Sequence, residues 1–397
     1  MAEFDCIVVG GGPAGAGAAI GLAAGGARVL LAEQRRFPRE KLCGEFISPE
    51  CLTHFARLGV LERMRAAGGE EISETIFYAP SGRGVNVPSE WFGSDGGSAA
   101  LGLSRAEMDA RLLARAREAG AVVLEDAALA GVVVEGGRVR GVRLHTGGGE
   151  SEHRARVVVD ATGRTRGVAR RAARELKRGG EGRESKSARA SLVAFKAHVE
   201  GARGAGGVCE IYFYPGGYGG LSPVEGGVSN LCFIARAGDV RERGSDAARV
   251  LREVLMRNRR AAETLEGASA RGEWLAVALE GFGRHSPVPA PGLLAVGDAA
   301  AFIDPFTGSG MLMALESGRL AARAVSAWLP AGGADFASLA RDYAGAYASR
   351  FDSRLRVCGA LRRAAFAPPA LAEFAVRALG ASRGVRRRLA RATRGES

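Results

Sequence analysis

The first thirty residues change from a strand-like apolar pattern to a helix of small residues and back. Phe4–Val9 is short, apolar and rich in β-branched side chains, which predicts a strand buried on both faces. Residues 13–24 predict a helix whose small side chains permit close packing on a sheet. Residues 27–32 predict a second buried strand that ends at Glu33. Together they form a βαβ unit of the usual size.

Similar patterns return further along the chain. Residues 105–119 predict an amphipathic helix, and residues 121–124 predict a strand. Two more apolar runs flank Gly136-Gly137, which is a strong hairpin signal. Residues 157–159 predict a buried strand that ends at Asp160. Residues 293–296 predict another, and a long helix is expected from about residue 309 to 328.

The middle of the chain has a different pattern. Residues 192–199, 210–214 and 228–235 alternate as strands of an antiparallel sheet do. Residues 246–265 predict a helix over this sheet, with Ser245 as its N-cap. Residues 176–189 are polar and basic without periodicity, so they predict an exposed connection. This middle segment therefore indicates a second lobe.

The predicted fold class is α/β, with a Rossmann-type lobe, an inserted mixed-sheet lobe and a helical C-terminus. We expect the Rossmann-type lobe to be discontinuous, built from residues 1–75, 100–175 and 282–330. Residues 76–99 and 185–281 would form the inserted lobe, and residues 331–397 the basic helical region.

Charge changes this picture only at the C-terminus. The formal net charge is +12, and residues 351–397 carry 11 Arg against 3 acidic residues. Aromatic residues are too scarce there for a base-stacking platform, so nucleic acid is not an expected partner. The basic segment is either a solvated amphipathic cap, which is the simpler interpretation, or a surface for an anionic membrane or an acidic carrier protein.

Two other features exclude function classes. Residues 6–27 are uncharged and long enough to span a bilayer, but Gly, Ala and Pro13 dominate them and no basic segment precedes them. The six cysteines form no C-x-x-C pair, so the sequence predicts no metal site. Free thiols favour a reducing, cytoplasmic location.

The loop after the first strand carries the main candidate chemistry. Gly10, Gly12 and Gly15 form a G-x-G-x-x-G pattern, with Pro13 and Ala14 between the last two. Such glycines permit the tight turn, the approach of a pyrophosphate and the packing of helix on sheet. The helix N-terminus then favours the phosphate anion.

Two residues after the second strand complete the predicted dinucleotide site. Glu33 lies 18 residues after Gly15, close to the usual spacing for a carboxylate that accepts hydrogen bonds from ribose hydroxyls. Gln34 is the neighbouring candidate. The sequence to this point predicts a dinucleotide but does not distinguish FAD from NAD.

Three later segments carry a resemblance. Asp160-Ala161-Thr162-Gly163 and Gly297-Asp298-Ala299-Ala300, which follow the glycine loop in this order, resemble the FAD-binding lobe of one flavoprotein family, and the stretch from Leu103 through Leu112 also resembles a segment of that family. That family includes aromatic hydroxylases, flavin halogenases and geranylgeranyl reductases. The resemblance implies FAD, with Asp298 at the ribityl chain and Arg105 near the cofactor. It also implies that the flavin pyrimidine edge lies at a helix start, here Gly308, Ser309, Gly310 and Met311.

The segment 37–45, with Lys41-Leu42-Cys43-Gly44, resembles the P-x-x-K-x-C-G stretch of the geranylgeranyl reductase group, as do residues 302–310 and 316–318. The chain departs from that group at Ser309, where Glu is usual. Residues 210–215 keep only the aromatic character and the Pro of the Y-x-W-x-F-P strand motif. The halogenase W-x-W-x-I-P motif is absent, and Ala301 replaces the His typical of hydroxylases.

The leading hypothesis is therefore an FAD-dependent reductase acting on a C=C bond of a small apolar, isoprenoid- or polyketide-like substrate. The alternative is a monooxygenase (a hydroxylase or epoxidase). A halogenase and a flavin-binding protein without turnover are further alternatives. No second complete G-x-G-x-x-G unit is evident, so NAD(P)H or another reductant would bind only transiently.

Candidate catalytic residues follow from these segments. Cys43 would lie over the flavin and position or protonate the substrate, or else fill space under a loop. Tyr212 and Tyr214, with the nearby Tyr218, would line a cavity or else pack in the sheet core. His198 is a lone histidine on a strand, for which a structural role is the simpler interpretation.

Overall fold

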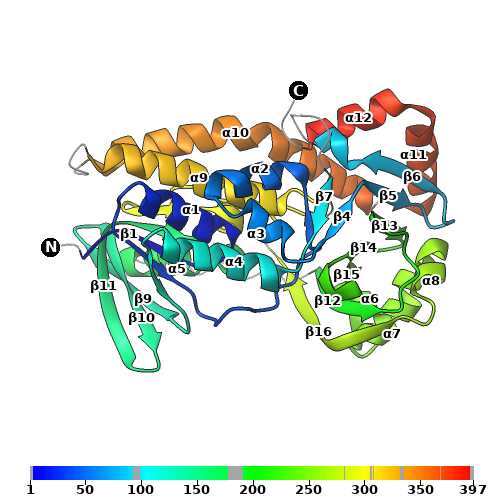
Figure 1. Cartoon of the computed structure of the whole chain (residues 1–397), viewed down its shortest axis with the longest axis horizontal. Helices are drawn as coiled ribbons and strands as arrows, with labels where there is room; N and C mark the ends of the chain where they lie inside the picture. Colours follow the sequence, from blue (N-terminus) through cyan, green and yellow to red (C-terminus); the bar gives the residue numbers. More distant parts are fainter. Residues whose placement is uncertain are drawn as a thin grey trace.

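The computed structural model describes residues 3–92, 99–177, 191–280, 282–304, 306, 308–330, 335–366 and 368–393. Two seven-stranded sheets lie at opposite ends of the molecule, and long helices run between them (Figure 1). The predicted segment 176–189 falls almost entirely outside the described residues, so its exposure stays a prediction.

The first sheet has the strand order β8-β2-β1-β11-β10-β9, and β18 pairs with β11. Its central pairs are parallel, as expected for strands that are apolar on both faces. The predicted hairpin is present as β9 and β10. The strands are β1 Phe4–Val9, β2 Val29–Ala32, β8 Val122–Leu124, β9 Ala128–Glu135, β10 Arg138–Thr146, β11 Gly149–Asp160 and β18 Leu293–Ala295.

Helices cover both faces of this sheet. Small residues let α1 and α9 approach closely: a Cβ on Gly318 of α9 would lie 2.3 Å from the Ala14 carbonyl oxygen of α1. Helix α4 packs beside α1, and α5 packs on β9. The helices are α1 Pro13–Ala24, α4 Arg105–Glu118, α5 Gly167–Lys177, α9 Gly310–Trp328 and α10 Phe336–Ala365.

The second sheet has the order β16-β12-β15-β14-β13-β5-β6, with β13 and β5 parallel and the other pairs antiparallel. Helices α6–α8 cover one face, and the other face meets the first lobe. Its elements are β5 Glu74–Tyr78, β6 Gly84–Pro88, β12 Leu192–Glu200, β13 Val208–Tyr214, β14 Gly217–Pro223, β15 Ser229–Arg236, β16 Ser269–Leu279, α6 Ala237–Glu242, α7 Ala247–Glu253 and α8 Arg259–Leu265.

The helix predicted over residues 246–265 is wrong in detail. The chain forms α7 and α8 with a short turn between them. Ser245 has φ +60 and does not cap α7. Asp246 is the N-cap instead, and its Oδ1 accepts hydrogen bonds from the amides of Ala248 and Arg249. The hydrophobic periodicity of the sequence continues through residues 254–258, so it predicted one helix. The chain turns there instead, and α7 and α8 pack separately on the sheet.

Short elements join the two sheets. They are β3 Phe46–Ile47, α2 Pro49–Leu58, α3 Leu61–Arg65, β4 Glu70–Ile72, β7 Ala100–Gly102, β17 Gly283–Arg284 and β19 Ala301–Phe302.

The C-terminal region is helical, as predicted. Helix α10 crosses the molecule beside α9, and α11 (Pro369–Ala381) and α12 (Arg383–Ala392) fold over β5 and β6 (Figure 1). Among the described residues, no helix is long and apolar enough to cross a membrane. The predicted fold class, a Rossmann-type lobe with a mixed-sheet lobe and a helical C-terminus, is confirmed.

Candidate flavin site

Two positions of the loop between β1 and α1 must be glycine because any larger residue would clash with neighbouring protein atoms. Gly10 has φ +110, and a Cβ there would lie 2.3 Å from the Ala161 carbonyl oxygen. A Cβ on Gly15 would lie 1.9 Å from the Gly10 carbonyl oxygen. Only glycine fits at both positions, so they fix the tight turn and the packing of α1 on the sheet.

Gly12 differs, because nothing in the protein excludes a side chain there. The nearest atom to a Cβ on Gly12 would be Nη2 of Arg105, 3.8 Å away. Gly12 is the N-cap of α1 and provides no side-chain cap for its first amides. The loop therefore leaves open space in front of a helix N-terminus, as a pyrophosphate requires.

Glu33 closes one side of this loop. Its Oε2 accepts a hydrogen bond from the Gly11 amide at 2.8 Å, and its Oε1 accepts one from the Arg35 amide at 3.0 Å. The side chain is 5% exposed, while the following Gln34 is exposed. The carboxylate is thus held at the rim of the loop, where a ribose would lie.

A group of cations surrounds Asp298 at the other end of the site. Burial raises the pKa of Asp298, and Arg164, Lys41 and Arg105 oppose that rise. Lys41 is exposed, and its pKa is lowered by desolvation from the surrounding protein and then by Arg105, Arg39 and Arg164. Arg105 and Arg39 are paired with Asp109, and an anionic cofactor would add favourable partners for Lys41 and Arg164.

Arg105 is held in one orientation. Its Nε and Nη2 donate to Asp109 at 3.0 and 2.7 Å, and the residue is 8% exposed. Burial disfavours its charge, but Asp109 and Cys43 raise the Arg105 pKa above the ordinary value. The sequence predicted Arg105 at the cofactor, and the structure places it beside Gly12.

The Gly297-Asp298 turn follows β18 and lies against α1 and α9. The Gly297 amide donates to Ser317 Oγ at 2.8 Å, and a Cβ on Gly297 would lie 3.0 Å from the Ala14 Cβ. Asp160 has another role. It accepts hydrogen bonds from Thr162 and from the Ala169 amide, which makes it a structural turn residue.

The start of α9 faces the same region. Ser309 is the N-cap residue, but its side chain does not accept from the helix amides. Its hydroxyl donates to the Thr393 carbonyl oxygen at 3.2 Å, which ties the C-terminus to this loop. A Cβ on Gly310 would meet no atom of the described residues within 4 Å, and Met311 is partly buried. Gly308 has φ +60, and Thr307 lies outside the described residues.

The prediction that Tyr212 and Tyr214 line a substrate cavity is wrong. Both are buried under the helices on the far face of the second sheet. Tyr212 donates to Glu210 at 3.0 Å, and Tyr214 donates to the carbonyl oxygens of Tyr218 and Ile234, both at 2.8 Å. Successive side chains of β13 point to opposite faces of the sheet, so Phe213, between the two tyrosines, points toward the first lobe.

Tyr218 lies on the face that meets the first lobe. Its hydroxyl donates a short hydrogen bond to Asp304 Oδ1, whose other oxygen lies 3.2 Å from Arg362 Nε. Burial and then Asp304 raise the Tyr218 pKa well above its ordinary value, so the phenol stays protonated. Tyr218 belongs to an aromatic cluster that we define as Phe213, Tyr218, Phe282, Phe302, Phe306 and Phe366.

Cys43 lies at the joint between the two sheets, partly buried. Its side chain is within hydrogen-bonding reach of Arg105, and its carbonyl oxygen accepts from Asn230 Nδ2 at 2.9 Å. The predicted candidate is therefore beside the cofactor region, and β15 of the second sheet fixes its backbone.

Sequence reasoning missed a buried charge network at this joint. Lys196 donates to Glu45 Oε1 at 2.7 Å and makes a short contact with Glu40, and His198 Nε2 lies 2.7 Å from Glu45 Oε2. Glu45 is 0% and Lys196 1% exposed. The only advance signal was that Lys196 and His198 share one face of a strand. The two glutamates and His198 are close enough to hold a metal ion, but the Lys196 ammonium already provides the positive charge there.

Comparisons with known proteins agree with this geometry. The profile of a family described as an FAD binding domain matches residues 3–336, so the chain belongs to that family. The site and the family together define an FAD-dependent oxidoreductase.

Three individual proteins are similar to this chain over most of its length. A digeranylgeranylglycerophospholipid reductase of Methanopyrus kandleri is 32% identical over 325 residues, covering 80% of this chain and 76% of that protein. A menaquinone reductase of Mycolicibacterium smegmatis is 32% identical over 327 residues, covering 80% and 75%. The structure of a geranylgeranyl bacteriochlorophyll reductase-like protein from Thermoplasma acidophilum matches with a TM-score of 0.80 at 24% identity. It covers 98% of this chain and 96% of that one.

Proposed function

We propose that the chain reduces a C=C bond of an apolar, isoprenoid-type substrate with electrons from its FAD. The observation that carries this proposal is the aromatic cluster, which joins the second sheet to the Asp298 and α9 region. An apolar cluster with one buried phenol beside this region supports a substrate with a hydrocarbon chain. The names of the two curated relatives support an isoprenoid chain.

Within this proposal, Gly10, Gly12, Ala14 and Gly15 hold the FAD pyrophosphate, and Glu33 with Gln34 binds the adenosine ribose. Arg105 and Asp298 hold the middle of the cofactor, and the α9 start from Gly308 to Met311 faces the flavin ring. The open space at Gly12 and the cation group around Asp298 fit this assignment.

When bound, reduced FAD supplies a hydride to one alkene carbon. A proton must reach the other carbon, and we propose Tyr218 and Cys43 as its candidate donors. Tyr218 holds a proton at Oη beside the aromatic cluster, with Asp304 and Arg362 behind it. The Cys43 side chain lies within hydrogen-bonding reach of Arg105. NAD(P)H or another reductant would reload the flavin transiently.

The test is anaerobic mixing of the reduced, FAD-loaded protein with a menaquinone or a geranylgeranyl-chain phospholipid. We expect flavin reoxidation and addition of two hydrogen atoms to the substrate, seen by mass spectrometry. Tyr218→Phe and Cys43→Ser should each slow reoxidation about 10²-fold or more if that residue is the proton donor. Tyr214→Phe is the matched control, because that phenol is equally buried on the far face. No reoxidation with any isoprenoid, or oxygen incorporation in air, would count against reduction.

A further inference from the structure

The exposed large apolar side chains of the described chain gather at its C-terminus. Leu371, Phe374, Val385 and Leu389 are 56%, 69%, 48% and 38% exposed, and Val122 is the only comparable residue elsewhere among those described. All four lie on α11 and α12. Scattered exposed residues need no explanation, but four on two consecutive helices do.

On α11 the apolar face is turned outward by anchors on the opposite face. Val376 packs against Ala79 and Val85 of the second sheet. Glu373 accepts hydrogen bonds from the Ser81 amide and hydroxyl at 2.7 and 2.8 Å. The other face carries Leu371, Phe374, Ala375 and Ala378, all exposed and spaced at i, i+3, i+4 and i+7. Helix α11 therefore has apolar side chains on both faces, and the set that includes Leu371 and Phe374 is turned toward solvent beside the exposed Arg377.

Helix α12 adds positive charge without any acidic residue. Its five arginines occur within ten residues, and Ser382 caps its N-terminus. Arg386 anchors the inner face by donating to the Asn86 carbonyl and Oδ1 at 2.8 and 2.6 Å, and it lies over the Trp91 ring. The outer face carries Val385 and Leu389 beside the exposed Arg388.

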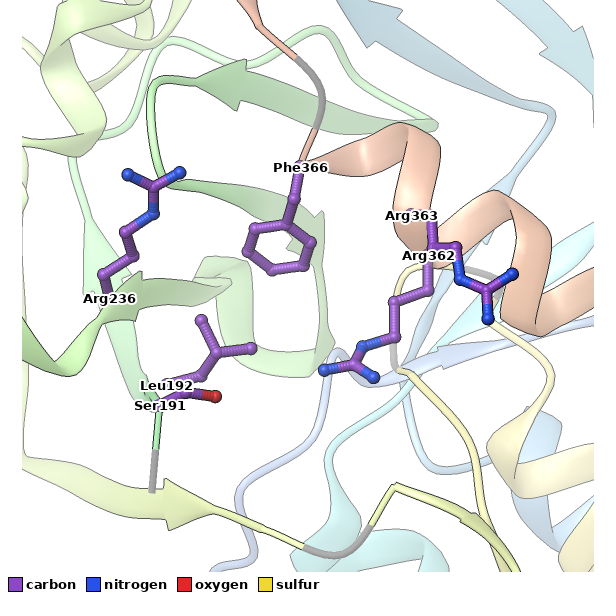
Figure 2. Close-up of a pocket in the computed structure, with 6 residues that line it drawn as sticks. All are labelled: Ser191, Leu192, Arg236, Arg362, Arg363 and Phe366. Carbon is purple, nitrogen blue, oxygen red and sulfur yellow. The ribbon is translucent and has the colours of Figure 1, made fainter. Parts of the chain in front are cut away.

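A pocket opens where α10 gives way to α11. It has a volume of about 440 Å³ and is lined by Ser191, Leu192, Arg236, Arg362, Arg363 and Phe366. Figure 2 shows the Phe366 ring between the Arg236 and Arg362 side chains. Phe366 and Leu192 also contact the hydrophobic group that contains Tyr218 and Phe302. Only two residues separate Phe366 from the start of α11, so the pocket leads from the C-terminal helices toward the aromatic cluster.

We propose that α11 and α12 bind the surface of a lipid bilayer that contains anionic lipids, close in the chain to the pocket that Phe366 lines. An anionic bilayer surface binds helices of this kind in two ways. Apolar side chains enter the headgroup region, and arginines bind lipid phosphates. A second copy of the chain would bring the exposed arginines of α12 against the same arginines, and an acidic protein would leave the apolar faces unsatisfied. The inference goes beyond the proposed reduction and does not depend on it.

The test is flotation of the FAD-loaded full chain with two kinds of vesicle, pure phosphatidylcholine and phosphatidylcholine with phosphatidylglycerol. We expect flotation with the phosphatidylglycerol vesicles and at least about tenfold weaker binding to the neutral ones. Leu371→Ser/Phe374→Ser and Arg387→Gln/Arg388→Gln should each weaken binding about tenfold or more. Val122→Ser, which removes an equally exposed apolar side chain from β8, should leave it unchanged.

Several outcomes would overturn the proposal. They are no flotation of the wild type, equal binding to both vesicles, or no effect of the two double substitutions. Light scattering that shows a dimer dissociating in Leu371→Ser/Phe374→Ser would assign the surface to a second copy. FAD content and anaerobic flavin reoxidation with a detergent-dispersed isoprenoid, measured on the same samples, report separately on the proposed reduction.

Discussion

Replacement of Lys196 by Met tests the energetics of the joint between the two sheets. Met keeps an unbranched side chain, one heavy atom shorter, and removes the charge. Lys196 Nζ lies 2.7 Å from Glu45 Oε1, and neither residue is more than 1% exposed. At an effective dielectric constant near 20 the attraction is about 6 kcal/mol, and desolvation offsets much of it. Without the ammonium, Glu45 is a buried charge that lacks its main cation, so the free energy of unfolding should fall by about 3–5 kcal/mol.

The loss should depend on pH in a defined direction. Burial opposes the charge of Glu45, but the His198 hydrogen bond and Lys196 lower the Glu45 pKa below 4.5. That contribution is present above pH 4.5 and is lost as pH falls through the folded-state pKa. Burial likewise opposes the charge of Lys196, but Glu45 and Glu40 raise its pKa above 10.5, so its contribution is lost only at higher pH. The effect of Lys196→Met should therefore be full between about pH 5 and 10 and shrink toward pH 4.

Urea unfolding of the FAD-loaded protein at pH 7 and pH 4 measures this loss. Arg203→Met is the matched control, because Arg203 and Glu266 are 2.8 Å apart but 67% and 70% exposed. It should cost less than about 1 kcal/mol. A double-mutant cycle with Glu45→Gln should give a coupling free energy of about 1–3 kcal/mol. A cost for Lys196→Met no larger than the control, or additive single effects, would refute the reasoning.

Three further substitutions test the site and the pH dependence. Gly12→Ala meets only Arg105 Nη2 at 3.8 Å, so circular dichroism should show an intact fold while FAD affinity, measured by flavin fluorescence, falls at least about tenfold. Gly15→Ala places a Cβ 1.9 Å from the Gly10 carbonyl oxygen, so the fold itself should be lost or severely destabilised. Burial lowers the His54 pKa from 6.5 to about 4. The unfolded state therefore binds the proton first, and stability should fall by up to about 3 kcal/mol between pH 6.5 and 4. His54→Gln should remove that part of the pH dependence in urea titrations, and an unchanged slope would contradict it.

The first lobe could be predicted from sequence because its determinants are local. The strand Phe4–Val9 and the helix Pro13–Ala24 were predicted to the residue, since buried parallel strands and small-residue helices have distinct patterns. The roles of Gly10 and Gly15 follow from contacts within a few residues of the loop and with Ala161. The contact between Gly15 and Gly10 is local and visible in a motif, whereas the contact between Gly10 and Ala161 joins segments far apart in the sequence.

The second lobe was harder because both faces of its sheet are buried. Alternation along β13 separates Tyr212 and Tyr214 from Phe213, but it does not say which face is covered by helices and which meets the first lobe. The faces differ only in what packs on them, and that is a tertiary property. The sequence therefore favoured Tyr212 and Tyr214 as cavity residues, and Tyr218 on the next strand was named only as a nearby residue.

The buried charge network of Glu45, Lys196 and His198 could not be predicted from the sequence either, because it depends on tertiary contacts. Glu45 has φ +54, a left-handed conformation that costs a non-glycine residue about 1–2 kcal/mol. The preceding Gly44, which would adopt that conformation freely, does not have a left-handed φ. Hydrogen bonds to charged groups contribute about 1.5–3 kcal/mol each. Glu45 makes such bonds with Lys196 and His198, residues more than 150 positions away, so these contacts outweigh the strain and fix the loop that carries Cys43. The left-handed conformation therefore falls on Glu45, whose side chain makes these contacts, and not on Gly44. No local sequence pattern would indicate this.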